Sequence, residues 1–150
     1  DLEDKNVGKF WQRVREGEPI TLDFSNKSIA SQIDAIRKTN KSRGAYGGPG
    51  WANYAASYYN DTNRYLGIIR KLLRRKGVAV IVIGNSIIQG VNLPVDKHIE
   101  EIGKGQRFQS LGIRLLRKKR VGSSIVDSSR RNGKKTNATL YESAVILSKP

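Results

Sequence analysis

The residues best placed to do chemistry follow an apolar run near the middle of the chain. Residues 78–83 are all apolar and mostly β-branched, and Gly84, Asn85 and Ser86 come directly after them. Such a run predicts a strand that is buried on both faces, as in a parallel sheet. In open α/β sheets, ligands bind at the carboxyl edge of the strands. We therefore expect these three residues to line a binding site, although a turn in which Asn85 bonds only to nearby backbone groups explains the same pattern.

Composition limits the other chemistries open to the chain. Its 150 residues include no cysteine and a single histidine, His98. Cysteine nucleophiles and thiolate zinc sites are therefore excluded, and no metal site is expected. We expect His98 to be a surface residue. Because no carboxylates show metal-binding spacing, a nuclease ranks third among the candidate functions. No apolar run approaches the roughly 20 residues of a membrane span, and no signal peptide is evident, so we expect a cytoplasmic protein without membrane contact.

Charge is the second strong signal. The formal net charge is +15, and between Lys104 and Lys135 eleven basic residues stand against one acid, Asp127. A cluster of this kind is the electrostatic footprint of a protein that binds the phosphate backbone of nucleic acids. The alternatives are a solvated basic surface and contact with anionic lipid. No amphipathic helix with an aromatic-rich apolar face is expected in this segment, so the lipid role is the weaker choice. The predicted phosphate contacts are Arg114, Arg117, Lys118, Lys119, Arg120, Arg130, Arg131, Lys134 and Lys135.

These residues depend on a regular series of elements that begins near residue 60. The spacing of apolar residues predicts a helix capped by Ser28, with Ile29, Ile33 and Ile36 on its apolar face, and a second helix capped by Asn60 or Asp61. It also predicts a helix with Pro94 in its first turn and an apolar face of Val95, Ile99 and Ile102, and strands over 78–83, 108–116 and 140–147. Residues 87–93 are expected to form a loop. A helix between the first two strands predicts a parallel crossover, and the last two strands predict an antiparallel hairpin. Residues 1–59 show little periodicity and are expected to be helical or irregular.

Several segments together point to a family. A helix ending in Leu-Leu-Arg-Arg-Lys-Gly leads into the strand that ends Gly84-Asn85-Ser86, and Gly-Val-Asn-Leu-Pro-Val-Asp follows at 90–96. A basic loop holds Arg-Asn-Gly-Lys at 131–134, and the last strand opens with Tyr141-Glu142-Ser143. Residues 60–149 thus resemble the C-terminal half of S-adenosylmethionine-dependent DNA amino-methyltransferases of the restriction-modification type.

The resemblance implies a fold, a site and partners. It implies part of a Rossmann-like methyltransferase sheet, made of a buried parallel strand, a crossover helix and a C-terminal β-hairpin. It also implies a pocket for the target base, adenine or cytosine, at Gly84, Asn85, Ser86, Tyr141 and Glu142. In the complete enzyme the cofactor is S-adenosylmethionine. The implied partners are DNA and the N-terminal half of the same enzyme or a partner subunit. If the strand over 78–83 has lost a neighbouring strand, its unpaired edge is also expected to recruit a second copy of the chain.

Two features of this family are missing from the sequence. The family holds its cofactor with a glycine-rich loop after a strand, and it grips the target amino group with an Asp/Asn/Ser-Pro-Pro-Tyr/Phe motif. The four prolines here are all isolated, and Gly47-Gly48-Pro49-Gly50 does not follow a predicted strand. We therefore interpret residues 60–150 as half of a methyltransferase-like domain without activity of its own, preceded by a variable, DNA-facing segment at 1–59. The alternative is a non-catalytic basic α/β module that binds DNA or RNA.

Overall fold

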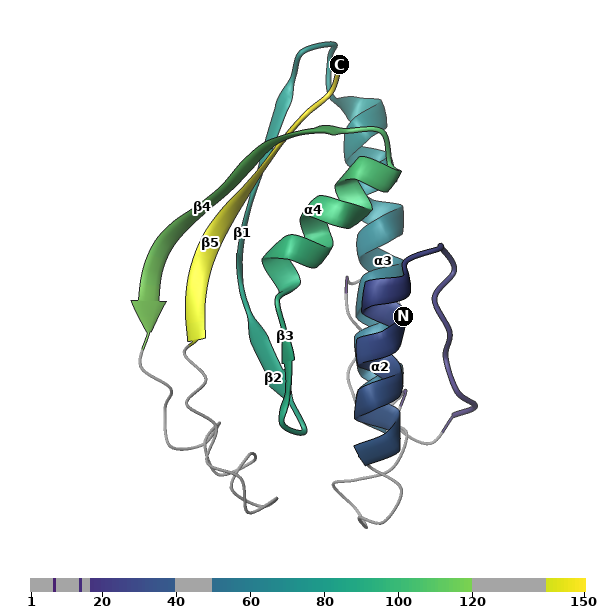
Figure 1. Ribbon diagram of the computed structural model, residues 1–150. Coiled ribbons are helices and arrows are strands. Elements are labelled where there is room, and N and C mark those ends of the chain that lie inside the picture. The colour runs from purple at the N-terminus through teal and green to yellow at the C-terminus, as the bar shows by residue number, and fades with distance from the viewer. Residues whose placement is uncertain (1–6, 8–13, 15–16, 40–49, 120–139) are drawn as a thin grey trace. The chain divides into compact units, whose positions relative to one another are not determined.

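The computed structural model describes residues 7, 14, 17–39, 50–119 and 140–150 (Figure 1). The chain divides into two compact units, Asp1–Tyr65 and Leu66–Pro150, and the division falls inside helix α3, Gly50–Leu72. Five of the predicted phosphate-binding residues lie outside the described residues: Arg120, Arg130, Arg131, Lys134 and Lys135.

In the first unit, helix α2 runs over Lys27–Thr39. Its apolar residues Ile29, Ile33 and Ile36 are buried, which confirms the predicted apolar face of this helix. The predicted cap at Ser28 is wrong. The Asn26 side-chain oxygen accepts a hydrogen bond from the Ile29 backbone N–H at 2.9 Å, so Asn26 supplies the N-cap.

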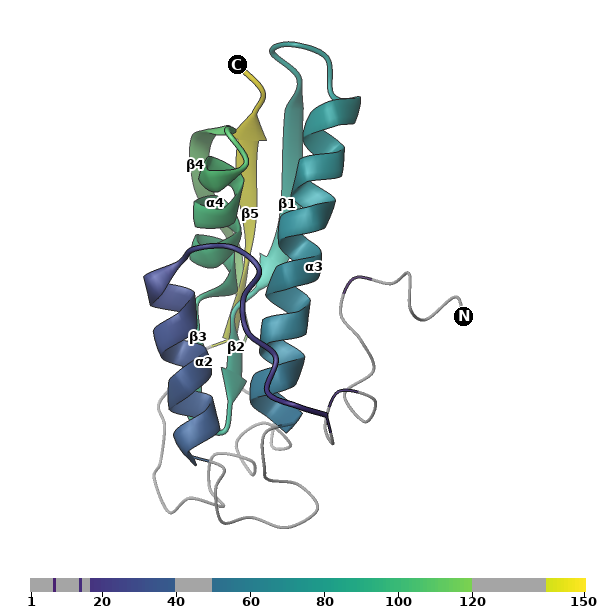
Figure 2. The ribbon, with the colours of Figure 1, turned by 90° about the vertical axis from the view of Figure 1, so that its right-hand side faces the viewer.

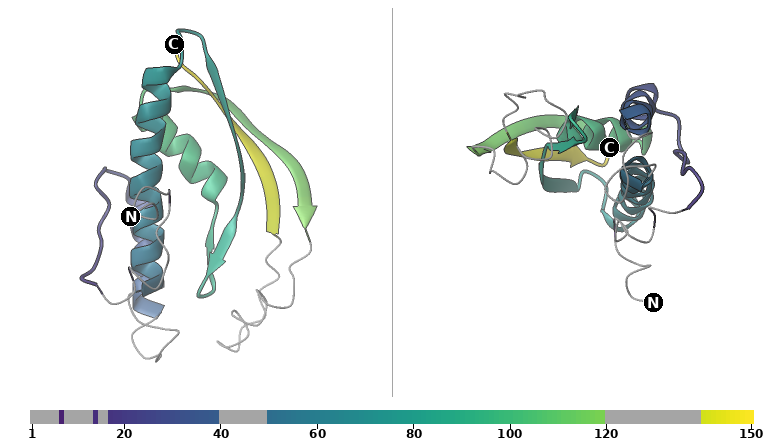
Figure 3. Two further views of the ribbon diagram at one scale, coloured as in Figure 1. Left: turned by 180° about the vertical axis from the view of Figure 1, so that it is seen from behind. Right: turned by 90° about the horizontal axis from the view of Figure 1, so that it is seen from below.

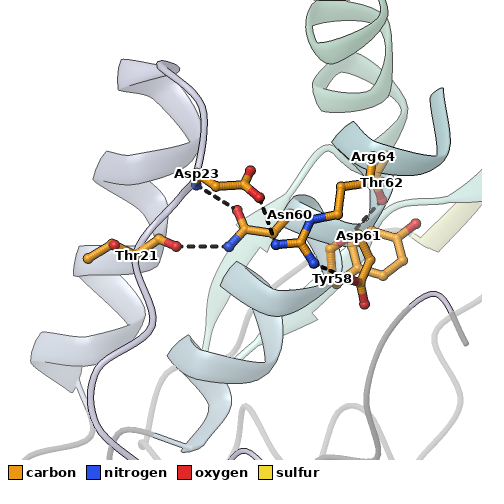
Figure 4. A network of polar contacts seen from close by, with 7 residues as sticks. All are labelled: Thr21, Asp23, Tyr58, Asn60, Asp61, Thr62 and Arg64. Carbon is orange, nitrogen blue, oxygen red and sulfur yellow. Dashed lines mark hydrogen bonds and ion pairs between the residues drawn. The ribbon is translucent and has the colours of Figure 1, made fainter. Parts of the chain in front are cut away.

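The first unit also holds two buried asparagines on α3. The Asn53 amide donates to the carbonyls of Gly17 and Glu18, and its oxygen accepts from the Ile20 N–H. Figure 4 shows Asn60 in a similar role: its amide donates to the Thr21 carbonyl and its oxygen accepts from the Asp23 N–H. These two side chains hydrogen-bond the backbone of residues 17–23, which form no helix or strand. The predicted helix start at Asn60 or Asp61 is therefore wrong, because Asn60 lies within the helix and bonds outward.

The second unit is built on a three-stranded sheet of β1 (Val78–Gly84), β4 (Gln109–Lys119) and β5 (Leu140–Ser148). The predicted C-terminal hairpin is confirmed, since β4 and β5 pair antiparallel. The expectation of a parallel sheet is wrong. The strand order is β1-β5-β4, so β5 lies between the other two and pairs antiparallel with both (Figures 1 and 3). Strands β1 and β4 do run in the same direction, but they share no hydrogen bonds.

One face of this sheet is covered by helix α4, Val95–Gly105 (Figure 2). The helix begins at Val95, so Pro94 occupies the N-cap position, one residue before the predicted first turn. It buries Ile99 and Ile102 against the sheet side that carries Val145 and Leu147. Fully burying such an aliphatic side chain contributes about 1.5–3 kcal/mol. This interface holds the second unit together.

The prediction that β1 is buried on both faces is wrong. Val78, Val80 and Val82 are 48%, 59% and 58% exposed, while Ala79, Ile81 and Ile83 between them are partly buried. Because side chains alternate along a strand, the three valines share the face that α4 does not cover. An unbroken β-branched run is compatible with either arrangement, so composition alone could not decide between them.

Residues 86–93 form a hairpin instead of the expected loop. Strand β2, Ser86–Ile88, pairs antiparallel with β3, Val91–Leu93. The two residues between them, Gln89 and Gly90, both have positive φ angles, 51° and 79°. That combination is typical of a type I′ turn, whose twist matches that of the paired strands.

Candidate functional site

The two segments that carry the family resemblance meet where β1 ends and β5 begins. Gly84 stands opposite Glu142 in the strand register. The side-chain oxygen of Asn85 accepts a hydrogen bond from the Tyr141 backbone N–H at 2.9 Å, although the two residues are 56 positions apart. The Asn85 amide also reaches Asn92 Oδ1 at 3.5 Å. Asn85 therefore joins the exit of β1 both to β5 and to the β2–β3 hairpin.

A buried carboxylate lies next to this junction and was not predicted from the sequence. Asp96, in the first turn of α4, is 4% exposed. Its carboxylate accepts hydrogen bonds from the Tyr141 hydroxyl at 3.0 Å, the Ser143 hydroxyl at 2.8 Å and the Lys97 N–H at 2.9 Å. The first turn of a helix favours negative charge, so the position suits a carboxylate. Asp96 thus fastens the start of α4 to alternate residues of β5.

We call the group formed by Asn85, Asp96, Tyr141 and Ser143 the polar junction. Tyr141 is the residue shared by both of its parts. Its backbone bonds to Asn85 and its hydroxyl bonds to Asp96. Burial raises the pKa of Tyr141 to about 12, and the hydrogen bond to the Asp96 carboxylate adds to the shift. The phenol therefore remains a neutral hydrogen-bond donor throughout the physiological range. In the sequence, the signal for this contact was the alternation of Tyr141 and Ser143 on one face of a strand.

Backbone approach is close at Gly84. A Cβ added at this position would lie 3.0 Å from the Tyr141 carbonyl oxygen, a distance that would require the neighbouring strand to shift. Ser86 begins β2, where it stands opposite Leu93. The five residues predicted for the base pocket thus belong to adjoining strand ends, and Asp96, Asn92 and Ser143 adjoin them.

The predicted phosphate contacts that the structure describes lie on β4. Arg114, Arg117 and Lys118 are exposed, and the backbone of Lys119 stands opposite Leu140. Arg117 forms a two-point ion pair with Glu142, with N–O distances of 2.5 and 3.2 Å. Glu142 is therefore engaged by β4 and not directed to a separate site. Arg114 and Arg117 share the open face of the sheet, because their partners Ala144 and Glu142 are two residues apart.

The prediction that His98 is a surface residue is wrong. Its side chain is 1% exposed on the covered side of α4. Burial lowers the pKa of His98, and the neighbouring carboxylates of Glu101 and Asp96 oppose that shift. His98 is thus a neutral core residue at physiological pH.

The described residues do not fit S-adenosylmethionine. A cofactor loop needs glycines between a strand and the helix that follows it. Here β1 leads into the β2–β3 hairpin, and the residues 91–94 that lead directly into α4 contain no glycine. Within the same part of the chain, no group of three or more histidine, cysteine, aspartate or glutamate side chains is placed to hold a metal ion. None of the described helices is both long enough and apolar enough to span a membrane.

Comparison of the chain with protein-family models, with curated proteins and with solved structures found no match.

Proposed function

We propose that the chain is the DNA-binding and target-base-pocket portion of an S-adenosylmethionine-dependent DNA amino-methyltransferase that acts on adenine or cytosine. The observation that carries this proposal is the hydrogen bond between Asn85 and the Tyr141 backbone. The resemblance depends on two anchors, Gly84-Asn85-Ser86 and Tyr141-Glu142-Ser143, that are far apart in the sequence. Their adjacency is what a shared pocket requires.

The polar junction supports a particular role for these residues. The side-chain oxygens of Asn85 and Asp96 accept hydrogen bonds from Tyr141 and Ser143. These two residues therefore hold the pocket in shape, and other groups bind the base. Tyr141 is partly buried, and its bonds at both the backbone and the hydroxyl fix the position of its ring. Aromatic rings of this kind stack on bases that have left the double helix.

The two edges of the sheet differ, and the difference suggests that β1 lacks a neighbouring strand. Strand β4 carries exposed charges and two register shifts, between Ser110 and Gly112 and between Leu115 and Arg117, and such features prevent pairing with another chain. Strand β1 has no charged residue and, within the described part of the chain, pairs only with β5. We therefore expect a further strand beside β1, from an N-terminal half of the same enzyme or from a partner subunit. The cofactor would be bound there.

The second candidate is a non-catalytic basic module that binds DNA or RNA. One observation favours it: the side chains of the polar junction bond mainly to one another, and the exposed charge of β4 alone suffices for backbone binding. The two candidates differ in whether an unpaired base matters.

Binding to mismatched duplexes distinguishes the two candidates. Extruding a base costs a few kcal/mol and costs least at a mismatch. A pocket-bearing chain should bind a duplex with a mismatched adenine or cytosine several-fold more tightly than the fully paired duplex. Tyr141→Phe, which keeps the ring, should retain this preference, and Tyr141→Ala should lose it while still binding paired DNA. Equal affinity of the unmodified chain for both duplexes would favour the basic module.

A further inference from the structure

A second basic surface lies at the end of the sheet opposite the polar junction. It is formed where α3 leads into β1, where α4 leads into β4 and where β5 ends. We call it the basic turn cluster, and its members are Arg70, Lys71, Arg74, Arg75, Lys76, Arg107 and Lys149. The sequence pattern placed the expected phosphate contacts elsewhere, on β4 and the segment after it.

Hydrogen bonds join the three parts of the basic turn cluster into one surface. Arg70 donates to the carbonyl of Arg107 at 3.4 Å, and the Lys149 ammonium donates to the carbonyl of Leu73 at 2.6 Å. The backbones of Lys76 and Lys149 are joined as well, at 2.8 Å. Residues from three separate segments therefore present their charges side by side.

The charges of this cluster are not neutralised by neighbours. The side chains of Lys71, Arg74, Arg75, Lys76 and Arg107 are exposed, and among the described residues none of the cluster forms an ion pair. The sequence contains no acid from Thr62 to Val95. Lys104, by contrast, lies near the end of the same α4 helix and pairs with Glu100 at 2.9 Å. A strong positive potential is therefore expected over the cluster.

Two of these cations occupy backbone positions that normally favour glycine. The Gly77 N–H donates to the Arg74 carbonyl at 2.9 Å, and Lys76, the third residue of that turn, has φ 62°. This is the pattern of a type II turn, whose third residue is usually glycine. Arg107 has φ 63° and lies just beyond α4 in a Schellman arrangement, with Phe108 bonded to Gly103 and Arg107 bonded to Lys104. Backbone strain of this kind is often retained where a side chain has a function.

The helix dipole explains only part of the cluster. It favours cations in the last turn of a helix, where Arg70 and Lys71 lie, and its effect falls off within that turn. Arg74, Arg75, Lys76 and Arg107 lie beyond the helix ends. Fold stability therefore does not account for charge at these positions.

We propose that the basic turn cluster is a second contact surface for the phosphate backbone of DNA. The seven residues of β1 separate it from the polar junction by about 20 Å, at about 3.3 Å per residue, so the two sites engage different parts of a duplex. The proposal rests on the proposed function for the identity of the polyanion as DNA. An anionic membrane is a poorer fit, because the exposed large apolar side chains of the described segment 66–78 are three, Ile68, Leu72 and Val78, and interfacial binding needs a broad apolar face.

The test uses substitutions that remove charge and relieve backbone strain together. Lys76→Gly with Arg107→Gly should leave the melting temperature unchanged or raise it, because glycine adopts positive φ without cost. Binding of a labelled, fully paired duplex is measured by fluorescence anisotropy over a range of salt concentrations. Each lost phosphate contact should flatten the slope of log affinity against log salt by about 0.9, so the double variant should lose up to about 1.8.

Lys104→Ala is the matched control, since it removes one charge from an ion pair close to the cluster. It should leave the salt slope unchanged. If the double variant binds with the parent's affinity and slope, or if its defect appears on phosphatidylserine vesicles and not on DNA, the proposal is wrong. The preference for a mismatched base reports separately on the proposed function. The salt slope of the double variant could be reduced while the parent shows no preference for a mismatched base. That result would contradict the proposed function and still support the basic turn cluster as a phosphate-binding surface.

Discussion

The two ends of the same small sheet use their polar side chains in opposite ways. At the polar junction, Asn85, Asp96 and Tyr141 turn toward one another and satisfy their hydrogen bonds internally. At the basic turn cluster, cations such as Arg74 and Lys76 point into solvent, and some occupy positions where glycine would be less strained. The difference separates residues that hold the fold in shape from residues that the fold can do without. The two groups should therefore respond differently to substitution.

The largest effect is expected from Asp96→Ala. It removes the acceptor for the buried Ser143 hydroxyl and the partner of Tyr141, and leaving buried donors unsatisfied costs about 2–4 kcal/mol of unfolding free energy. Urea unfolding followed by circular dichroism measures the loss. Ser143→Ala, which removes one donor and leaves the carboxylate its other bonds, should cost about 1 kcal/mol. A loss no greater for Asp96→Ala than for Ser143→Ala would show that the carboxylate does not organise this end.

Asn85→Ala should have the next largest effect. The substitution leaves the Tyr141 N–H without its acceptor, at a cost of about 1–2 kcal/mol. Asn92→Ala removes only the 3.5 Å contact to the Asn85 amide and should change stability by less than about 0.5 kcal/mol. The same unfolding assay compares the two. Equal losses would mean that the bond to β5 is not what secures Asn85.

Alkaline pH should weaken the polar junction through Tyr141. The folded-state pKa of Tyr141, about 12, lies above the ordinary value of 10.0. Above pH 10 the unfolded chain loses the phenolic proton before the folded chain does, so stability falls as the pH rises toward 12. The unfolding free energy should therefore fall less between pH 9 and pH 11 in Tyr141→Phe than in the parent, because the variant has no phenol at this position to ionise. An identical fall in the parent and in Tyr141→Phe would mean that the Tyr141 hydroxyl does not bond to Asp96.

The smallest effect, and one of opposite sign, is expected at the basic turn cluster. Lys76→Gly should raise the unfolding free energy by up to about 1 kcal/mol, because the left-handed backbone costs a residue with a Cβ about 1–2 kcal/mol and the added flexibility of glycine offsets part of the gain. Thermal unfolding measures it against Gly77→Ala, which would bring a Cβ to 2.8 Å from the Arg74 carbonyl and should destabilise. A destabilised Lys76→Gly would mean that the lysine serves the fold.

Local patterns predicted much of the second unit. The apolar faces of α2 and α4, the span of β1 and the antiparallel β4–β5 hairpin all follow from spacing, turn residues and the proline before α4. The partner of each strand does not follow in the same way. Nothing in residues 140–148 states that this strand lies between β1 and β4, because the choice depends on packing across the whole sheet. For the same reason, the uncovered face of β1 was not foreseen.

The candidate site was predictable as segments and not as contacts. Gly84, Asn85 and Tyr141 were singled out from their places beside strands and from the family resemblance. Asp96 was missed because a single acid at a helix start reads as a dipole or capping residue, and its bonds to Tyr141 and Ser143 span more than 40 positions. His98 was misplaced because its neighbours at 96, 100 and 101 are acidic, whereas helical spacing turns it to the same side as Val95 and Ile102.

Photocrosslinking can locate an extruded base on the chain. A duplex carrying a photoreactive base at a mismatched position is irradiated with the chain, and the crosslinked peptide is identified by mass spectrometry. A base pocket at the polar junction predicts attachment at Tyr141 or its immediate neighbours, with loss of that product in Tyr141→Ala and no change in the control Tyr65→Phe. Attachment confined to basic residues of β4 or of the basic turn cluster would contradict a base pocket at this end of the sheet.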